Sequence, residues 1–237
     1  MTEDPTLAEL VTAHAGAARL LERHHLDYCC GGGQRLSAAC ADQGLDPGQV
    51  LGELTALDPR VVPDWAAMGP AELVDHLEAT HHRYLHDEFP RLSALAEKVA
   101  DVHGGRHPEL FEVQGTFDEL RADLEPHLMK EERVLFPMIR ELDAAIAAPA
   151  FRCGTLRNPI SMMLIEHDRA GELLARLRAL TSDYTTPRDG CASYRALYDG
   201  LAELEADTHM HIHKENNLLF PAVLEREDRL VSAAVRP

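Results

Sequence analysis

Two segments of the sequence repeat one pattern of residues that can bind a metal ion. In each segment a histidine is followed four residues later by a glutamate, and a Phe-Pro pair follows the glutamate at the same offset. The two copies are His127, Glu131, Phe136 and Pro137, and His211, Glu215, Phe220 and Pro221. Residues four apart lie on one face of an α-helix, so each copy presents an imidazole and a carboxylate together.

Chance accounts for one such pair in a chain with 14 histidines and 40 acidic residues, but not for two copies with the same ending. Both pairs also continue leucine-rich stripes with steps of three and four, which places them on the face that forms a core. A buried ionisable group is costly unless it is paired or bound to a metal. The repeat therefore predicts a carboxylate-bridged dinuclear iron site in a helical bundle rather than two core ion pairs.

Two further histidines complete the expected ligands. His167 lies on the apolar face of its predicted helix. In the helix before the first repeat, His82 precedes an Arg-Leu pair by the same spacing as His167 does, which favours His82. The apolar residues upstream favour His81 instead, and His86, four residues after His82, is an additional alternative. The residues alone leave this choice open.

Four imidazoles and two carboxylates suit two iron ions. Carboxylates bridge hard cations, and imidazole is a ligand for both Fe(II) and Fe(III). Each iron then keeps coordination positions for a bridging oxygen and for a diatomic ligand. A structural zinc site would need a closed tetrahedral set, usually with cysteine. Manganese or a mixed metal pair stays open.

The pattern of apolar residues and helix breakers predicts an all-α protein. Thr6 and Glu9 form a capping box for a first helix that runs to three glycines at 31–33, and Asp46 is the expected cap of a helix starting at Pro47. Prolines between 57 and 70 indicate a linker. Four long helices are then expected at about 71–102, 108–146, 159–181 and 192–219, followed by a short C-terminal extension.

The composition excludes several classes of partner. The net charge is −17, which argues against nucleic acid and anionic membrane surfaces. No stretch is apolar enough for a membrane span, and the acidic N-terminus does not resemble a signal peptide. Five cysteines do not form a disulfide framework, so we expect a reducing, cytoplasmic location.

Four motifs together resemble a known family. They are Asp-Tyr-Cys-Cys-Gly-Gly at 27–32, His-Leu-Met-Lys-Glu-Glu-Arg-Val-Leu-Phe-Pro at 127–137, Glu-His-Asp-Arg-Ala-Gly-Glu-Leu-Leu at 166–174, and Glu-Asn-Asn-Leu-Leu-Phe-Pro at 215–221. The chain resembles the repair-of-iron-centres (RIC, ScdA/YtfE-type) family of di-iron proteins over nearly its whole length. The resemblance implies a small N-terminal ScdA-type helical domain (1–56), a linker (57–70) and a hemerythrin-like di-iron four-helix bundle (71–237).

The resemblance also implies the residues of the centre and its cofactor. The ligands would be His82, His127, His167 and His211, with Glu131 and Glu215 as bridging carboxylates. They would hold two non-haem iron ions per chain, joined by an oxo or hydroxo bridge.

Three further residues are candidates for a catalytic role. Cys29 and Cys30 are adjacent, which disfavours a disulfide between them because the small ring strains the peptide bond. Both thiols could receive or pass on iron, or dock against a damaged cluster; the alternative is a pair of small buried residues at a helix end. Glu166, beside His167, is either a carboxylate supporting a ligand or an exposed glutamate.

The remaining histidines and cysteines are expected to be incidental. His209 and His213 should lie on the outer face of the last helix. The histidines expected to be solvated or capping are His14, His24, His25, His76, His103 and His107, and the cysteines without an expected role are Cys40, Cys153 and Cys191.

The first functional hypothesis is the repair of iron–sulfur clusters damaged by nitrosative or oxidative stress. Its chemistry would be iron delivery, or nitric oxide reductase activity at the di-iron site, and the residues do not decide between them. The partners would be damaged iron–sulfur proteins, and nitric oxide or dioxygen as small ligands. The alternative is a hemerythrin-like protein that binds or senses dioxygen or nitric oxide; iron storage is a weaker third hypothesis. A homodimer formed through the N-terminal domain is a further expectation.

Overall fold

The computed structural model describes residues 4–14, 16–56 and 64–235. Within these ranges the regular structure is helical, apart from one isolated β-bridge between Thr6 and Arg35. The all-α prediction is thus confirmed. The first half of the expected linker (57–70), residues 57–63, lies outside the described residues. Within the described ranges, no helix is both long and apolar enough to cross a membrane.

The chain divides into two compact units. One contains Met1–His76, Met138–Asn158 and His209–Pro237, and the other contains Leu77–Pro137 and Pro159–Thr208. The second unit is built from parts of six helical elements. They are η2 (Glu78–His82), α6 (Arg83–His103), α7 (Glu109–Lys130), η3 (Glu131–Leu135), α9 (Arg157–Leu180) and α10 (Ala192–Lys214).

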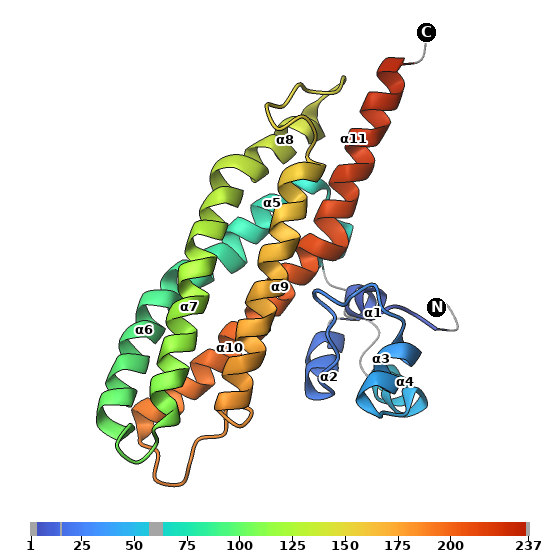
Figure 1. Cartoon of the computed structure of the whole chain (residues 1–237). Helices are drawn as coiled ribbons and strands as arrows, with labels where there is room; N and C mark the ends of the chain where they lie inside the picture. Colours follow the sequence, from blue (N-terminus) through green and yellow to red (C-terminus); the bar gives the residue numbers. More distant parts are fainter. Residues whose placement is uncertain (1–3, 15, 57–63, 236–237) are drawn as a thin grey trace. The chain divides into compact units, whose positions relative to one another are not determined.

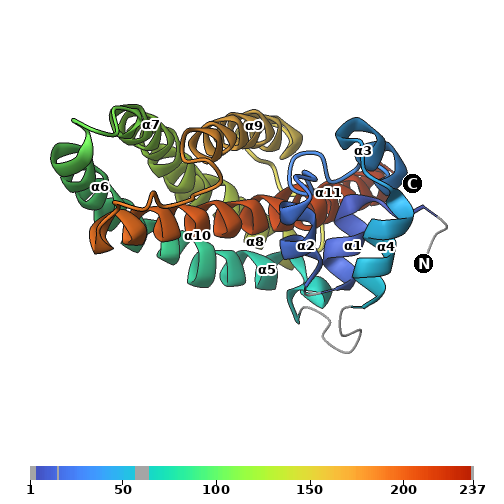
Figure 2. The same cartoon turned by 90° about the horizontal axis from the view of Figure 1, so that it is seen from below.

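The long helices of the second unit, α6, α7, α9 and α10, run alongside one another (Figure 1, Figure 2). Side-chain contacts join them into a ring. The contacts are Phe89–Phe117 between α6 and α7, Arg176–Glu112 between α9 and α7, Arg178–Glu205 between α9 and α10, and Gly200 against Leu92 between α10 and α6. A Cβ atom at Gly200 would lie 2.7 Å from Leu92 Cδ2, so glycine permits this close approach of two helices. Each helix packs on two others, which makes the unit a four-helix bundle.

The core of the bundle consists of the apolar stripes that the sequence shows. Leu85, Phe89, Phe117, Leu120 and Leu201 are all at most 1% exposed. Fully burying side chains of this size contributes about 1.5–3 kcal/mol each. This burial holds the helices that carry the candidate ligands in a fixed register.

Three short π-helical turns interrupt the long helices. They are η2, η3 and η4 (Glu215–Leu219), and candidate metal ligands lie within each of them. In η3 the N–H of Phe136 donates to the carbonyl of Glu131, and in η4 the N–H of Phe220 donates to that of Glu215. Proline follows in both cases and has no N–H to donate. The repeated Phe-Pro pair therefore coincides with a shift of the helical hydrogen bonds, a feature frequent at functional sites.

Two expected helix boundaries are wrong. The last helix does not end at Leu219 but continues as α11 (Phe220–Val235), because the π-helical turn accommodates Pro221. The first helix is in fact two, α1 (Leu7–Ala13) and α2 (Ala17–Arg23). The backbone of His14 is extended there, with φ −137° and ψ 115°, which ends α1.

The first unit contains the other helices of the described residues. They are α1, α2, α3 (Leu36–Gln43), α4 (Pro47–Thr55), η1 (Asp64–Ala67), most of α5 (Pro70–Leu77) and of α8 (Phe136–Ala144), η4 and α11. The predicted caps are present: the Glu9 N–H donates to Thr6 Oγ1 at 3.1 Å, and the Gly48 N–H donates to Asp46 Oδ1 at 2.9 Å. The starts of these two helices are therefore determined by capping residues that can be recognised in the sequence.

Candidate metal centre

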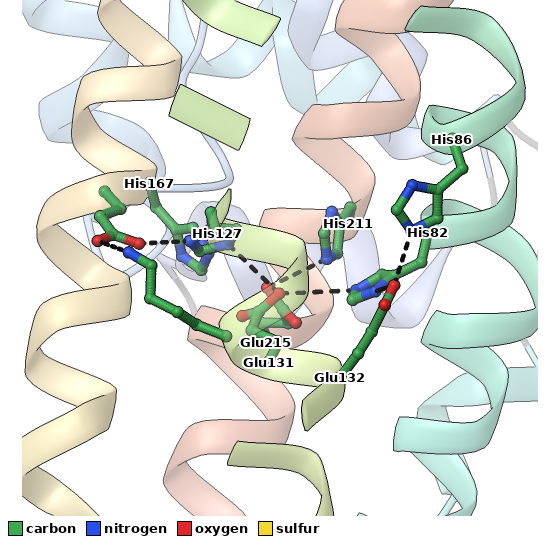
Figure 3. Close-up of polar contacts among 10 residues, drawn as sticks. His82, His86, His127, Glu131, Glu132, His167, His211 and Glu215 are labelled. Carbon is green, nitrogen blue, oxygen red and sulfur yellow. Dashed lines mark hydrogen bonds and ion pairs between the residues drawn. The ribbon is translucent and has the colours of Figure 1, made fainter. Parts of the chain in front are cut away.

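Four of the six predicted ligands meet inside the bundle of the second unit. Glu131 Oε2 lies 3.3 Å from His127 Nε2 and 3.6 Å from His82 Nε2. His167 Nε2 lies 3.2 Å from His127 Nε2. Figure 3 shows these four side chains directed toward one another. All four are buried, and Glu131 is 0% exposed.

This set of atoms fits a bound cation. The ligand atoms of His127, Glu131 and His167 all lie within 4.8 Å of one another. A carboxylate removed from water needs a compensating positive charge nearby, and imidazole nitrogens directed at the same point supply further ligands for a transition metal. Nitrogen and oxygen ligands without cysteine suit iron better than structural zinc.

The other two predicted ligands form a matching pair in the first unit. His211 Nε2, at the end of α10, lies 3.3 Å from Glu215 Oε2 in η4. This distance equals that between His127 and Glu131, and Glu215 is likewise 0% exposed. The sequence repeat is thus also a repeat of local geometry and burial.

Glu166 lies beside the ligand candidate His127. Its Oε2 atom is 2.8 Å from His127 Nδ1, and its other carboxylate oxygen contacts Lys130. The hydrogen bond with His127, together with Lys130, holds the pKa of Glu166 at about 2 in spite of partial burial. A carboxylate bonded to Nδ1 leaves Nε2 as the metal-binding nitrogen, which is the usual arrangement for ligating histidines.

Glu132 has the same role toward His82, and the sequence analysis missed it. Its Oε1 atom lies 3.0 Å from His82 Nδ1 and 2.9 Å from Nε2 of the half-exposed His86. Figure 3 shows Glu132 between these two histidines. His81 instead bonds to Asp207 at 2.8 Å, so His82 is the histidine beside Glu131. The available signal was that a second glutamate, Glu132, directly follows Glu131.

Cys29 and Cys30 are free thiols on a loop organised by Asp27. The carboxylate of Asp27 accepts the backbone N–H groups of Cys29, Cys30 and Gly31 at 2.9–3.0 Å, and the Cys29 thiol at 3.1 Å. The two sulfur atoms are 3.8 Å apart. The contact with Cys30 and burial raise the pKa of Cys29, so its proton is held, while Cys30 is the more exposed thiol.

The Cys-Cys loop is fastened to the helix that carries Glu215. The side-chain amide of Asn217 donates to the carbonyls of Tyr28 and Cys29 at 3.3 and 3.1 Å. A Cβ atom at Gly32 would lie 2.6 Å from the Asn217 side chain, so glycine is needed there. Within the first unit, the thiols and one bridging carboxylate candidate therefore share a common support.

Two histidines expected to be incidental are buried: His213, predicted on the outer face of its helix, and His103, predicted to be solvated or capping. His213 is 0% exposed, because Tyr28 and Trp65 pack on its ring with centroids 5.6 and 5.8 Å away. Its burial lowers its pKa to about 4. His103 is 5% exposed. The helical positions were inferred correctly, but the segments that cover them are remote in sequence.

The fold and the site define an all-helical, metal-binding protein of the hemerythrin type. Residues 73–223 match the hemerythrin HHE cation binding domain, and residues 3–58 match the ScdA_N domain, described as a domain of unknown function (DUF542). The chain belongs to the ScdA/YtfE-type family with a hemerythrin-like domain, as the resemblance of its motifs predicted.

Several relatives match along almost their whole length. The iron–sulfur cluster repair protein YtfE of Edwardsiella ictaluri is 39% identical over 223 residues, which cover 93% of this chain and 97% of the relative. That of Cronobacter sakazakii is 38% identical, with 94% and 98% covered. A probable iron–sulfur cluster repair protein of Haemophilus influenzae is 36% identical, with 93% and 97% covered.

Proposed function

We propose that the protein binds two iron ions and repairs damaged iron–sulfur clusters. The ligands are His82, His127, His167 and His211, and the bridging carboxylates are Glu131 and Glu215. The observation that carries this proposal is the burial of two glutamates, each 3.3 Å from a histidine four residues earlier. Two adjacent cations would compensate both carboxylates. The hemerythrin HHE match includes all six residues.

The chain's own residues prepare this site. Glu166 and Glu132 accept hydrogen bonds at the Nδ1 atoms of His127 and His82, which fixes the orientation of both rings. The closely packed leucine and phenylalanine core limits the access of water. When bound, a pair of irons supplies electrons and open positions for a small ligand such as nitric oxide or dioxygen.

Repair is assigned by combining the site with the names of the relatives. Iron–sulfur cluster repair is what those relatives are named for, and we propose the same targets, damaged iron–sulfur proteins, for this chain. In this proposal, an N-terminal domain (1–56) presents Cys29 and Cys30 to the target. A linker (57–70) joins it to the iron-binding domain (71–237). Asp27 and the two thiols have ligand atoms within 4.8 Å of one another, which suits a transient site for iron as cargo.

The experiment that tests the iron centre is metal analysis with optical and EPR spectroscopy. Protein purified without added metal should contain about two irons per chain, and the Glu131→Ala variant should contain far less iron. Arg133→Ala, two residues away at an exposed position, is the matched control and should keep both irons. Iron-free wild-type protein that also takes up no Fe(II) under anaerobic conditions would contradict the proposal.

Repair is tested separately with an iron–sulfur enzyme inactivated by nitric oxide. Iron-loaded protein should restore its activity, while iron-free protein should not. Equal recovery with both forms would refute repair but leave the iron centre standing. Release of nitrous oxide under reducing conditions distinguishes nitric oxide reduction from iron delivery.

A further inference from the structure

A cysteine and a histidine meet at the start of α10, inside the second unit. Cys191 Sγ lies 3.1 Å from His103 Nε2. Cys191 is exposed to solvent, whereas the His103 ring is 5% exposed and packs on Tyr194. His103 follows His82 by 21 residues in α6, which is roughly 30 Å along the helix. The pair is therefore separate from the proposed iron ligand.

The backbone before α10 presents Cys191 as the helix cap. The Gly190 N–H donates to the carbonyl of Pro187 at 2.9 Å, which closes a tight turn. A Cβ atom at Gly190 would lie 2.6 Å from Thr186 Cγ2, so a larger residue here would displace the Thr186 side chain. The Cys191 carbonyl accepts the N–H of Arg195 at 3.1 Å, the first hydrogen bond of the helix.

This position surrounds the sulfur with hydrogen-bond donors. Besides the His103 ring at 3.1 Å, the backbone N–H groups of Tyr194 and Ser193 in the first turn of α10 act on the sulfur. Free N–H groups at a helix N-terminus stabilise an anion, and they do so for thiolates. Together with His103 they lower the pKa of Cys191 to about 7.

The neighbouring charged groups are already paired with one another. Asp189, the carboxylate nearest in sequence, bonds to His107 Nε2 at 3.1 Å and lies 3.6 Å from Arg106 Nη1. His107 Nδ1 also contacts Glu109 at 3.1 Å. Tyr194 bonds to Tyr198 through its hydroxyl group. The Asp189 carboxylate is thus paired with His107 and Arg106, which lie in the turn before α7.

We propose that Cys191, held by His103 and the N-terminus of α10, is a reactive thiol oxidised by small uncharged hydroperoxides. The thiolate sulfur attacks one peroxide oxygen; the S–O bond forms as the O–O bond breaks. Sulfur loses two electrons and becomes a sulfenic acid. The peroxide gains them, and the departing hydroxide, or alkoxide from an organic hydroperoxide, takes a proton from solvent to give water or an alcohol. A net charge of −17 disfavours anionic oxidants, which is why the proposal names uncharged ones.

The test compares cysteines within the same iron-loaded protein. After hydrogen peroxide treatment and trapping of sulfenic acids with dimedone, trypsin releases Cys191 in peptide 189–195 and Cys153 in peptide 153–157. Iodoacetamide labelling of the same peptides between pH 5 and 9.5 measures thiolate reactivity. Half-buried Cys153 is the internal reference.

Cys191 should be labelled about fivefold faster at pH 7 than an ordinary thiol. With a pKa near 7 it is about half ionised there, against about 1% for the ordinary value of 9.0. The thiolate fraction of Cys191 is thus about fiftyfold larger, but a less basic thiolate is about tenfold less nucleophilic, which leaves about fivefold. The excess should disappear near pH 9.5, and the dimedone adduct should appear first in peptide 189–195.

Two variants test the role of His103. His103→Phe should lower the labelling rate at pH 7 by at least about threefold, while His103→Gln, which keeps an N–H donor, should retain most of it. Iron content should stay at the wild-type level in both. Equal labelling of Cys191 and Cys153 in the wild-type protein, or peroxide oxidation that spares Cys191, would overturn the proposal whether or not the variants fold.

Discussion

The side-chain amide of Asn217 donates a hydrogen bond of 3.1 Å to the backbone carbonyl of Cys29. Asn217 stands two residues after Glu215, so the helix that carries a proposed bridging carboxylate also holds the loop with the two thiols. Both residues belong to the same compact unit. A change at Glu215 can therefore reach the Cys29–Cys30 loop through the backbone between Glu215 and Asn217 and the hydrogen bond that Asn217 donates.

Asn217→Ala should loosen the Cys-Cys loop without unfolding it. The variant loses the bonds to the carbonyls of Tyr28 and Cys29, each worth about 0.5–1.5 kcal/mol. Hydrogen exchange of backbone amides at 27–34 should accelerate by roughly fivefold to a hundredfold. Asn158→Ala, which removes a bond to the Cys153 carbonyl instead, is the matched control. Unchanged exchange at 27–34 in Asn217→Ala would show that these two bonds do not hold the loop.

The adjacent glutamates Glu131 and Glu132 should differ in their effect on iron. Glu131→Ala removes a buried carboxylate at the proposed centre, so iron should stay low even with excess Fe(II). Glu132→Ala removes the acceptor that orients His82; we expect affinity to fall by roughly 10–100-fold, yet loading should recover at high iron. Titration with Fe(II) followed by metal analysis separates the two. Equal losses at saturating iron would show that the two faces of this helix were assigned wrongly.

The two thiols should be needed for repair but not for iron binding. Cys30→Ser should reduce recovery of a nitric oxide-treated iron–sulfur enzyme more than Cys29→Ser does, because Cys30 is the more exposed and Cys29 keeps its proton. Iron content should match the wild type in both variants. Cys153→Ser controls for the loss of a half-buried thiol elsewhere. Full repair by the double Cys29→Ser/Cys30→Ser variant would instead favour a gas-binding role, which needs only the bundle.

Sequence reasoning was most successful where the signal is local. The four-residue spacing of each His-Glu pair fixes one helical face, and the caps at Thr6 and Asp46 follow from neighbouring residues. It failed where the determinant lies far along the chain. Heptad-like stepping placed His213 opposite His211, but could not show that Tyr28 covers it.

The treatment of proline shows a second limit. A proline normally ends a helix, so the sequence predicts a boundary before Pro221 and only a short extension after it, whereas α11 runs to Val235. The π-helical turn before it uses a longer hydrogen bond, from Phe220 to Glu215, and lets the helix continue. The sequence shows the Phe-Pro pair as part of the repeat, but it does not show that a π-helical turn precedes each pair.

The ion pair between His107 and Asp189 should give a pH-dependent contribution to stability. The hydrogen bonds that His107 donates to the carboxylates of Asp189 and, second, Glu109 raise the pKa of His107, and His107 lowers the pKa of Asp189. A raised histidine pKa stabilises the fold below its unfolded value of about 6.5, and this contribution is lost as pH rises through the folded value. The thermal midpoint of wild type should therefore exceed that of Asp189→Asn most at pH 5–6.5, and the difference should shrink toward pH 9. Asp199→Asn, at an exposed position of α10, should show no such trend. A difference that is constant over this range would mean that the pair is not ionic.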